Sequence, residues 1–165
     1  MTIAIIADLH DNEPYLTAFL SYCKKNKIDQ LLIAGDIGSI ESLEKIPKKQ
    51  FKKIYFVFGN ADNFSEKDLP KHIINLGDGG IIELGNKKIG ICHEPYKIEK
   101  LILEKPEIIF YGHTHKPWVE VKDKTLLVNP GSLGGVFIPS TFAVWNLTRP
   151  APELIRTEEV FKKTL

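Results

Sequence analysis

The chain has 165 residues, of which 43% are apolar and 26% charged, and its formal net charge is +1 at pH 7. This length suits one domain over residues 1–165, and the composition is typical of a globular protein rather than a disordered one. The small net charge provides no overall field to attract nucleic acid or an anionic membrane, and every apolar run is too short to span a bilayer.

Five short apolar runs in the first two thirds of the chain indicate buried strands. Each is followed by Asp, Asn or His: residues 3–7, 31–34, 55–58, 89–92 and 108–111. Uninterrupted apolar runs are typical of strands that are covered on both faces. The first run begins without a basic leader, so we expect a cytoplasmic protein.

Three helices are expected between these strands. The first spans 14–26, because Pro14 suits a helix start and an apolar stripe runs through residues 16, 19, 20 and 23. Shorter helices are expected at 42–45 and 98–105, the second of them ended by Pro106. Cys23 continues the apolar stripe, so we assign it to core packing. The only other cysteine is Cys92, so neither a disulfide framework nor a zinc knot is indicated.

The second half of the chain is rich in hairpins. Turns at Gly85-Asn86 and Asp123-Lys124 separate paired strands, and two late strands follow: 81–84, 88–92, 118–121, 125–128, 142–147 and 154–157. This order, βαβ-like first and hairpin-rich later, predicts two β-sheets packed face to face with helices outside. Four aromatic side chains are expected in the core rather than at a dimer contact: Trp118, Phe137, Phe142 and Trp145.

Seven polar side chains follow five separate predicted strands. They are Asp8, His10, Asp36, Asn60, His93, His113 and His115. Any one of them alone would most simply be a turn former or a capped side chain. The set, however, includes four of the five histidines in the chain. The remaining one, His72, lies in a predicted loop and is interpreted as a surface residue.

The chemistry of this set predicts a metal site. The pairs Asp8-x-His10 and His113-x-His115 have a spacing that returns both side chains to one side of extended backbone. Imidazole, carboxylate and amide donors without thiolate suit Mn, Ni, Fe, Co or Zn better than Ca or Mg. Seven donors exceed the about four to six that one ion uses, which predicts two divalent ions sharing Asp36.

The motifs together resemble the calcineurin-like metallophosphoesterase superfamily. They are Asp8-x-His10, Gly35-Asp36, Gly59-Asn60, a strand-end His93 and Gly112-His113-x-His115, in this order. Asn60-Ala61-Asp62 and Asn129-Pro130-Gly131-Ser132 resemble its small prokaryotic phosphodiesterase branch. The resemblance implies an α/β fold, a four-layer αββα sandwich of two mixed β-sheets flanked by helices. It also implies a phosphodiesterase that uses a metal-bridging hydroxide as its nucleophile at a dinuclear site, with a small phosphodiester as substrate.

The same resemblance distributes roles among the candidate residues. One metal would be held by Asp8, His10, Asp36 and His115, and the other by Asp36, Asn60, His93 and His113. Catalytic roles are expected for Asp36, Asn60 and His113, and contacts with the substrate phosphate for Asn60 and Ser132. Asn-Pro-Gly-Ser is also an ordinary turn sequence, so a structural role for Ser132 is the alternative.

Two positions depart from the family pattern, and two other functions remain open. Ala61 stands where much of the superfamily has a histidine credited with helping the leaving group depart. Glu94 follows His93 in place of glycine, and we interpret it as a solvated turn residue rather than a partner of a metal ligand. A non-catalytic scaffold or assembly subunit is the alternative to an enzyme, but no expected metal donor is missing. A single-metal protein would need fewer donors, and association with further copies of the chain is left open.

Overall fold

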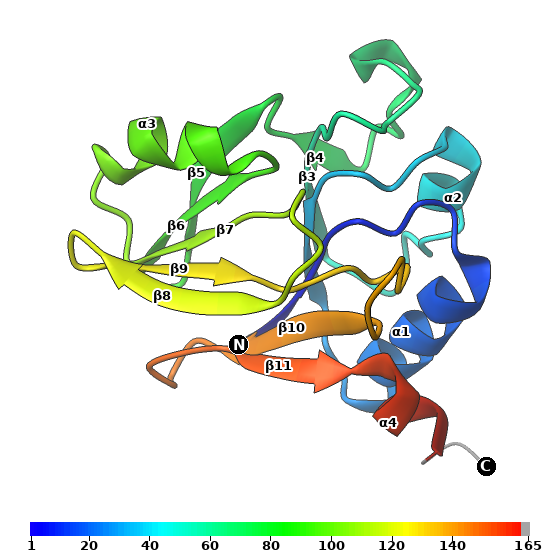
Figure 1. Ribbon diagram of the computed structural model, residues 1–165. Helices are drawn as coiled ribbons and strands as arrows, with labels where there is room; N and C mark the ends of the chain where they lie inside the picture. The colour runs from blue at the N-terminus through cyan, green and yellow to red at the C-terminus, as the bar shows by residue number, and fades with distance from the viewer. Residues whose placement is uncertain (163–165) are drawn as a thin grey trace.

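Two mixed β-sheets pack face to face in the computed structural model, which describes residues 1–162 and the side chains of residues 1–160 (Figure 1). The six-stranded sheet has the order β11-β10-β1-β2-β3-β4. Its strands are β1 (Thr2–Ile6), β2 (Gln30–Ala34), β3 (Lys53–Val57), β4 (Ile73–Asn75), β10 (Thr141–Asn146) and β11 (Glu153–Arg156). Strands β1 to β4 run parallel, whereas β10 and β11 are antiparallel to their neighbours.

The five-stranded sheet has the order β5-β6-β7-β9-β8. Its strands are β5 (Gly79–Leu84), β6 (Lys87–Cys92), β7 (Ile108–Phe110), β8 (Trp118–Lys122) and β9 (Thr125–Asn129). The strands β6, β7 and β9 are parallel, and the hairpins add β5 and β8 as antiparallel edges. The expected pairing of two mixed sheets is confirmed.

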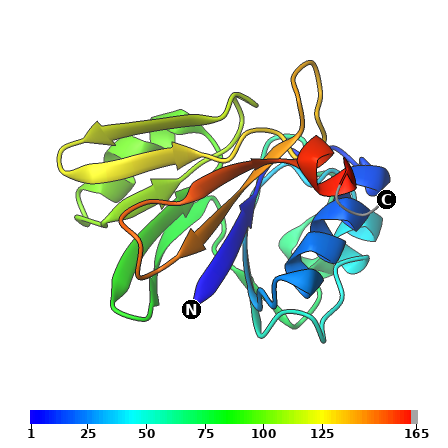
Figure 2. The same cartoon turned by 90° about the horizontal axis from the view of Figure 1, so that it is seen from below.

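Helices cover the outer faces of the two sheets (Figures 1 and 2). Helices α1 (Glu13–Lys25), α2 (Ile40–Glu44) and α4 (Thr157–Lys162) lie on the side of the six-stranded sheet, and α3 (Ile98–Ile102) lies on the five-stranded one. Short 3₁₀ helices, η1 (Glu66–Asp68) and η2 (Pro95–Lys97), interrupt the loops. The four-layer αββα order is therefore confirmed. No helix of residues 1–162 is long and apolar enough to cross a membrane.

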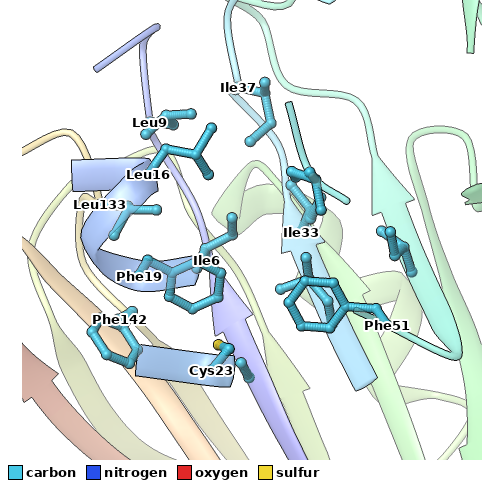
Figure 3. Close-up of a cluster of buried hydrophobic side chains, with 14 of the residues drawn as sticks. Ile6, Leu9, Leu16, Phe19, Cys23, Ile33, Ile37, Phe51, Leu133 and Phe142 are labelled. Carbon is cyan, nitrogen blue, oxygen red and sulfur yellow. The ribbon is translucent and has the colours of Figure 1, made fainter. Parts of the chain in front are cut away.

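The apolar core forms in layers because the strand residues alternate between faces. On the helix side, Ile6 and Ile33 of the parallel strands pack with Phe19, Cys23 and Phe142 (Figure 3). The alternate strand residues fill the space between the sheets: Ile5, Leu32, Val57, Ile91, Phe110 and Trp145 are among them. The core role of Cys23 is confirmed, since its side chain is fully buried.

Several expected boundaries differ from the structure. The helix predicted over 98–105 ends at Ile102, and the main chain tightens so that the N–H of Lys105 donates to the carbonyl of Ile102. Lys105 has φ 53° and precedes Pro106, a position that disfavours helical backbone. The last predicted strand ends at Arg156 because Thr157 starts α4. Strand β4 and helix α4 were not predicted.

Three side-chain expectations are also corrected. Phe142 and Trp145 are buried as expected, but Trp118 is 48% and Phe137 99% exposed, because one lies on an edge strand and the other in the loop after β9. His72 is half-buried rather than on the open surface, since the next residue, Ile73, starts β4 and joins the core.

Candidate metal centre

The seven candidate donors lie on loops that leave the carboxyl ends of five strands. The loop after β1 carries Asp8 and His10, the loops after β2 and β3 carry Asp36 and Asn60, and the five-stranded sheet contributes the remaining histidines after β6 and β7. Main-chain bonds join the loops: the N–H of Leu9 donates to the carbonyl of Asp36, and that of Gly112 donates to the carbonyl of His93. The parallel strands therefore bring residues that are far apart in the sequence together at the carboxyl ends of the strands.

The first donor group contains Asp8, His10, Asp36 and His115, whose ligand atoms all lie within 4.8 Å of one another. The Nε2 atoms of His10 and His115 are 3.1 Å apart. His115 Nε2 is 3.6 Å from Asp8 Oδ1, and His10 Nε2 is 3.8 Å from Asp36 Oδ2. This cluster of imidazole and carboxylate donors fits one transition-metal ion.

The second donor group is centred on Asn60. Its Oδ1 is 2.8 Å from His113 Nδ1 and 3.2 Å from His93 Nε2. The same His93 Nε2 is 3.2 Å from Asp36 Oδ2, so this carboxylate oxygen faces both donor groups. The other oxygen, Asp36 Oδ1, accepts the main-chain N–H of Ala61 at 2.7 Å. Asp36 Oδ2 therefore lies between the two donor groups and could contact a metal ion held by either.

The hydrogen bonds of His93 provide a test of whether a cation fits here. Its Nδ1 lies 2.8 Å from the carbonyl of Ala34, which can only accept, so Nδ1 carries a proton. A neutral ring would then present the Nε2 lone pair to two acceptor oxygens, those of Asp36 and Asn60. Either a proton or a bound cation must lie between these atoms. A metal ion could accept the lone pairs of all three, His93 Nε2, Asp36 Oδ2 and Asn60 Oδ1.

Electrostatics lower the pKa of Asp36 and raise that of Asp8 beside it. Burial raises the pKa of Asp8 to about 7, and the nearby Asp36 carboxylate adds to this, partly offset by His93. Burial opposes ionisation of Asp36 too, but hydrogen bonds from His93 and Ala61 hold its pKa below the ordinary value. Burial and the neighbouring His10 lower the pKa of His115, so this ring is neutral and able to bind a metal.

The backbone at the donors is strained. Five of the seven have positive φ although none is glycine: Asp8 (52°), His10 (49°), Asp36 (55°), His113 (70°) and His115 (61°). Left-handed backbone at a residue with a Cβ costs on the order of 1–3 kcal/mol and is concentrated at functional sites. Asp and His tolerate it better than branched residues do. The surrounding loops therefore hold the donors in place against a local cost in free energy.

Gly59 allows the loop after β3 to approach the Asp36 carboxylate. A Cβ at this position would lie 2.1 Å from Asp36 Oδ1 and 2.5 Å from the Asp36 amide nitrogen. Both contacts are far inside van der Waals distance, so any side chain here would displace the carboxylate or the loop. The glycine before Asn60 is thus required by the closeness of the two loops.

The sequence interpretation missed the part played by Asp62. Its carboxylate accepts the main-chain N–H groups of Gly59 at 2.8 Å, Gly38 at 3.0 Å and Asp36 at 3.1 Å. Burial raises the pKa of Asp62, and these hydrogen bonds partly offset that effect. The residue joins the loop of Asp36 to the loop of Asn60 and so positions both donors. Its place two residues after a candidate ligand was the available signal, since Asp readily accepts neighbouring N–H groups.

Ser132 and Asn129 also position the loops. The Ser132 hydroxyl is fully buried, donates to the carbonyl of Asp8 at 2.8 Å and accepts the N–H of Gly135 at 3.1 Å. This burial and these main-chain contacts favour the structural role that was the alternative for Ser132, and its contact with a phosphate stays a prediction. Asn129 Nδ2 donates to the carbonyl of Gly112, which fixes the start of the His113 loop.

Glu94 is not the solvated turn residue that was expected. Its side chain is only 17% exposed and its carboxylate lies 2.8 Å from Lys97 Nζ. Burial opposes ionisation, but the hydrogen bond from Lys97 keeps the pKa of Glu94 below its usual value. Glu94 is covered because the 3₁₀ helix η2 starts at the next residue, Pro95, and brings Lys97 back to the Glu94 carboxylate. The pair covers the chain next to His93 and contributes no donor to either group.

The raised pKa of Asp8 predicts a pH dependence of metal affinity. An ion must displace the proton from this carboxyl group below about pH 7, so affinity should fall as pH falls. From this group alone we expect binding about 20- to 30-fold weaker at pH 5.5 than at pH 7.5. The metal-free fold should change in the opposite sense, because an acid with a raised folded pKa loses stability as pH rises from its unfolded value of 3.8 to about 7.

Titration calorimetry with Mn²⁺ across this pH range, together with thermal unfolding of the metal-free protein, measures both effects. Affinity that stays constant between pH 5.5 and 7.5 would contradict the assignment of Asp8 as a buried donor.

Comparison with known proteins supports the fold described above. The family model described as the calcineurin-like phosphoesterase superfamily domain matches residues 1–149. The chain is 24% identical over 144 residues to phosphodiesterase MJ0936 of Methanocaldococcus jannaschii, covering 82% of this chain and 86% of that protein. A solved archaeal phosphodiesterase superposes with a TM-score of 0.80 at 22% identity, covering 94% of this chain and 99% of the other. Vps29 of Entamoeba histolytica, solved with Zn²⁺, superposes with a TM-score of 0.71 at 19% identity, covering 95% and 99%.

Proposed function

Since the chain belongs to the calcineurin-like phosphoesterase superfamily, we propose that it is a phosphodiesterase with a dinuclear metal centre. The observation that carries the proposal is the position of Asp36 Oδ2, which lies 3.2 Å from His93 Nε2 and 3.8 Å from His10 Nε2 and so faces both donor groups. We assign Asp8, His10, Asp36 and His115 to one ion, and Asp36, Asn60, His93 and His113 to the other.

The exposure of the donors defines the direction from which a substrate approaches. Asp8 and His93 are fully buried and Asp36 is nearly so, which makes them the floor of the site. Asn60 and His113 are exposed, and we place them at the mouth, in contact with the phosphate. Two divalent transition-metal ions (Mn, Ni, Fe, Co or Zn), when bound, would lower the pKa of a shared water and offset charge on the phosphoryl oxygens.

The chain's own residues would hold this chemistry in place. Asp36 would fix the separation between the two positions, with one oxygen held by the Ala61 N–H. His93 is oriented by the Ala34 carbonyl and Asp8 accepts the N–H of His113 through both oxygens at 3.1 Å. Donors locked by such contacts need little reorganisation during the reaction, which is the main source of electrostatic catalysis.

Ala61 shapes the substrate preference. A positioned general acid accelerates departure of a leaving group by typically about 10²–10⁴-fold, and the methyl group of Ala61 cannot act as one. Its main-chain N–H is also engaged with Asp36. We therefore expect diesters with aryl leaving groups to be hydrolysed readily and alkyl monoesters to be poor substrates.

The proposal is tested with metal-loaded protein and bis(4-nitrophenyl) phosphate. Hydrolysis should require Mn²⁺ or another of the five metals, cease after exhaustive chelation and return when the metal is restored. Glycerol phosphate, an alkyl monoester, should react slower by a factor on the order of 10² or more. Turnover that survives chelation would contradict metal catalysis.

A non-catalytic scaffold is the competing function. The fold is shared with structures of Vps29 at TM-scores of 0.68 to 0.71, which at their 19–23% identity speaks for the fold alone. The complete set of seven donors favours the enzyme, since a scaffold can lose a metal donor without penalty. Protein that binds metal but hydrolyses no ester in the test above would favour the scaffold.

A further inference from the structure

Strand β8 forms an unprotected outer edge of the five-stranded sheet. It is the outermost strand of its sheet (Figures 1 and 2) and pairs only with β9 among residues 1–162. All five of its residues are exposed. The exposed side chains include apolar ones, Trp118 at 48%, Val119 at 45% and Val121 at 71%. An edge strand of this kind presents unpaired main-chain N–H and C=O groups as a template for another strand.

The other described sheet edges are shorter, covered or charged. Strand β4 has three residues, and β5 packs against α3. Strand β11 carries Glu153 and Arg156 and contacts α4. Such features are the usual protections of an edge. Strand β8 also carries two charges, Glu120 and Lys122, but three of its five residues are exposed and apolar.

The two faces of β8 differ in chemistry. Val119 and Val121 lie opposite Val128 and Leu126 of β9, which belong to the core between the sheets. The alternate residues Trp118, Glu120 and Lys122 are on the outer face, where Lys122 also pairs with Glu99 of α3. One face is therefore apolar, and the other carries one charge of each sign two residues apart.

We propose that β8 pairs antiparallel with β8 of a second copy of this chain, about a two-fold axis at Val121. A two-fold interface uses the same patch on both partners, so it must be self-complementary. With the axis at Val121, the two Val121 side chains meet, and Glu120 of each chain lies opposite Lys122 of the other. Opposite charges placed directly across antiparallel strands are stabilising.

The alternative registers lack this complementarity. Directly opposite residues share a face of the sheet, so the axis must pass through a residue. An axis at Glu120 would place two carboxylates opposite each other, and an axis at Val119 would oppose Lys122 to Lys116. Like charges in that position are destabilising. An axis at Trp118 would also bring opposite charges together, Lys116 and Glu120, but it would place Pro117, which has no N–H to donate, opposite Val119. The axis at Val121 joins an apolar centre to two ion pairs without a proline in the paired strand, and it gives one continuous sheet through both copies.

A cysteine crosslink tests the register. In Val121→Cys the two thiols would be directly opposite, with Cα atoms about 4.5–5.5 Å apart, which suits a disulfide. In the matched variant Val119→Cys they would be four residues out of register, about 13 Å apart. The native Cys23 and Cys92 are fully buried and do not compete. We expect disulfide-linked dimer from the first variant in at least about tenfold excess over the second under mild oxidation.

Charge exchange tests the same contact in the unlinked protein. At about 100 µM chain, light scattering should show dimer for the wild type. Glu120→Lys should weaken the dimer at least about tenfold, and the double variant E120K/K122E should restore it. Glu153→Lys on β11 is the matched control and should leave the dimer unchanged. A monomeric wild type, equal crosslinking of both cysteine variants, or a dimer unaffected by Glu120→Lys would each overturn the proposal.

Discussion

Replacing Asp36 with Ala should lower kcat/KM for an aryl phosphodiester by a factor on the order of 10³ or more. The reason is geometric. Asp36 Oδ2 lies 3.8 Å from His10 Nε2 and 3.2 Å from His93 Nε2, so its loss removes a metal ligand from both donor groups. Bound metal should fall at both positions rather than at one. Steady-state kinetics and elemental analysis of the same preparation measure the two losses together.

His72→Ala is the matched control for this variant. His72 is half-buried and its Nε2 has no hydrogen-bond partner among the described residues, so removing the ring breaks no contact of the site. Its kcat/KM should stay within about twofold of the wild type. An Asp36→Ala protein with near-normal turnover and full metal content would show that the bridging assignment is wrong.

Gly59→Ala should be almost as damaging, although it adds a single methyl group. The new Cβ would lie 2.1 Å from Asp36 Oδ1, where it must displace the Asp36 carboxylate or push the Asn60 loop away. A displacement of about 1 Å at a catalytic group costs on the order of 10²-fold in rate. Overpacking of this kind also lowers the free energy of unfolding by about 1–3 kcal/mol.

Gly80→Ala is the matched control, because it makes the same substitution at a position with room for the added methyl group. Its Cβ would be no closer than 3.6 Å to the nearest atom, in ordinary contact with Leu76, and its φ is not in the left-handed region. Kinetics and chemical denaturation of the two variants separate a general effect of losing glycine from the specific contact. Equal activity in both would contradict the close approach of the Asp36 and Asn60 loops.

The strands and the polar residues after them were predictable because each apolar run marks a buried strand and its end marks where the loop begins. A short uninterrupted apolar run such as 31–34 has the length of a strand and is typical of one covered on both faces. Parallel strands then bring their carboxyl ends to the same end of the sheet. The convergence of the donors followed from that pattern. Weaker elements lacked such a signal: β4 has three residues, and its apolar pair Ile73-Ile74 is too short to show a period.

The roles of polar residues around the donors were the least predictable. Ser132 and Asp62 both lie in motifs that suggest ligand contacts, yet in the structure they bind the main chain of Asp8 and Asp36. Which polar group meets which N–H depends on how loops from different strands pack, and a sequence pattern records only local spacing. Glu94 is a similar case, because its ion pair with Lys97 depends on the 3₁₀ turn between them.

The most direct test of a dinuclear centre is the number of ions bound per chain. Metal-free protein would be equilibrated with a small excess of Mn²⁺ by dialysis at pH 7.5, and the bound metal counted by elemental analysis against the protein concentration. The seven converging donors with a shared Asp36 predict about two ions per chain, falling together in Asp36→Ala. A saturating value of one ion per chain, unchanged over the same metal concentrations at which hydrolysis appears, would contradict the dinuclear account.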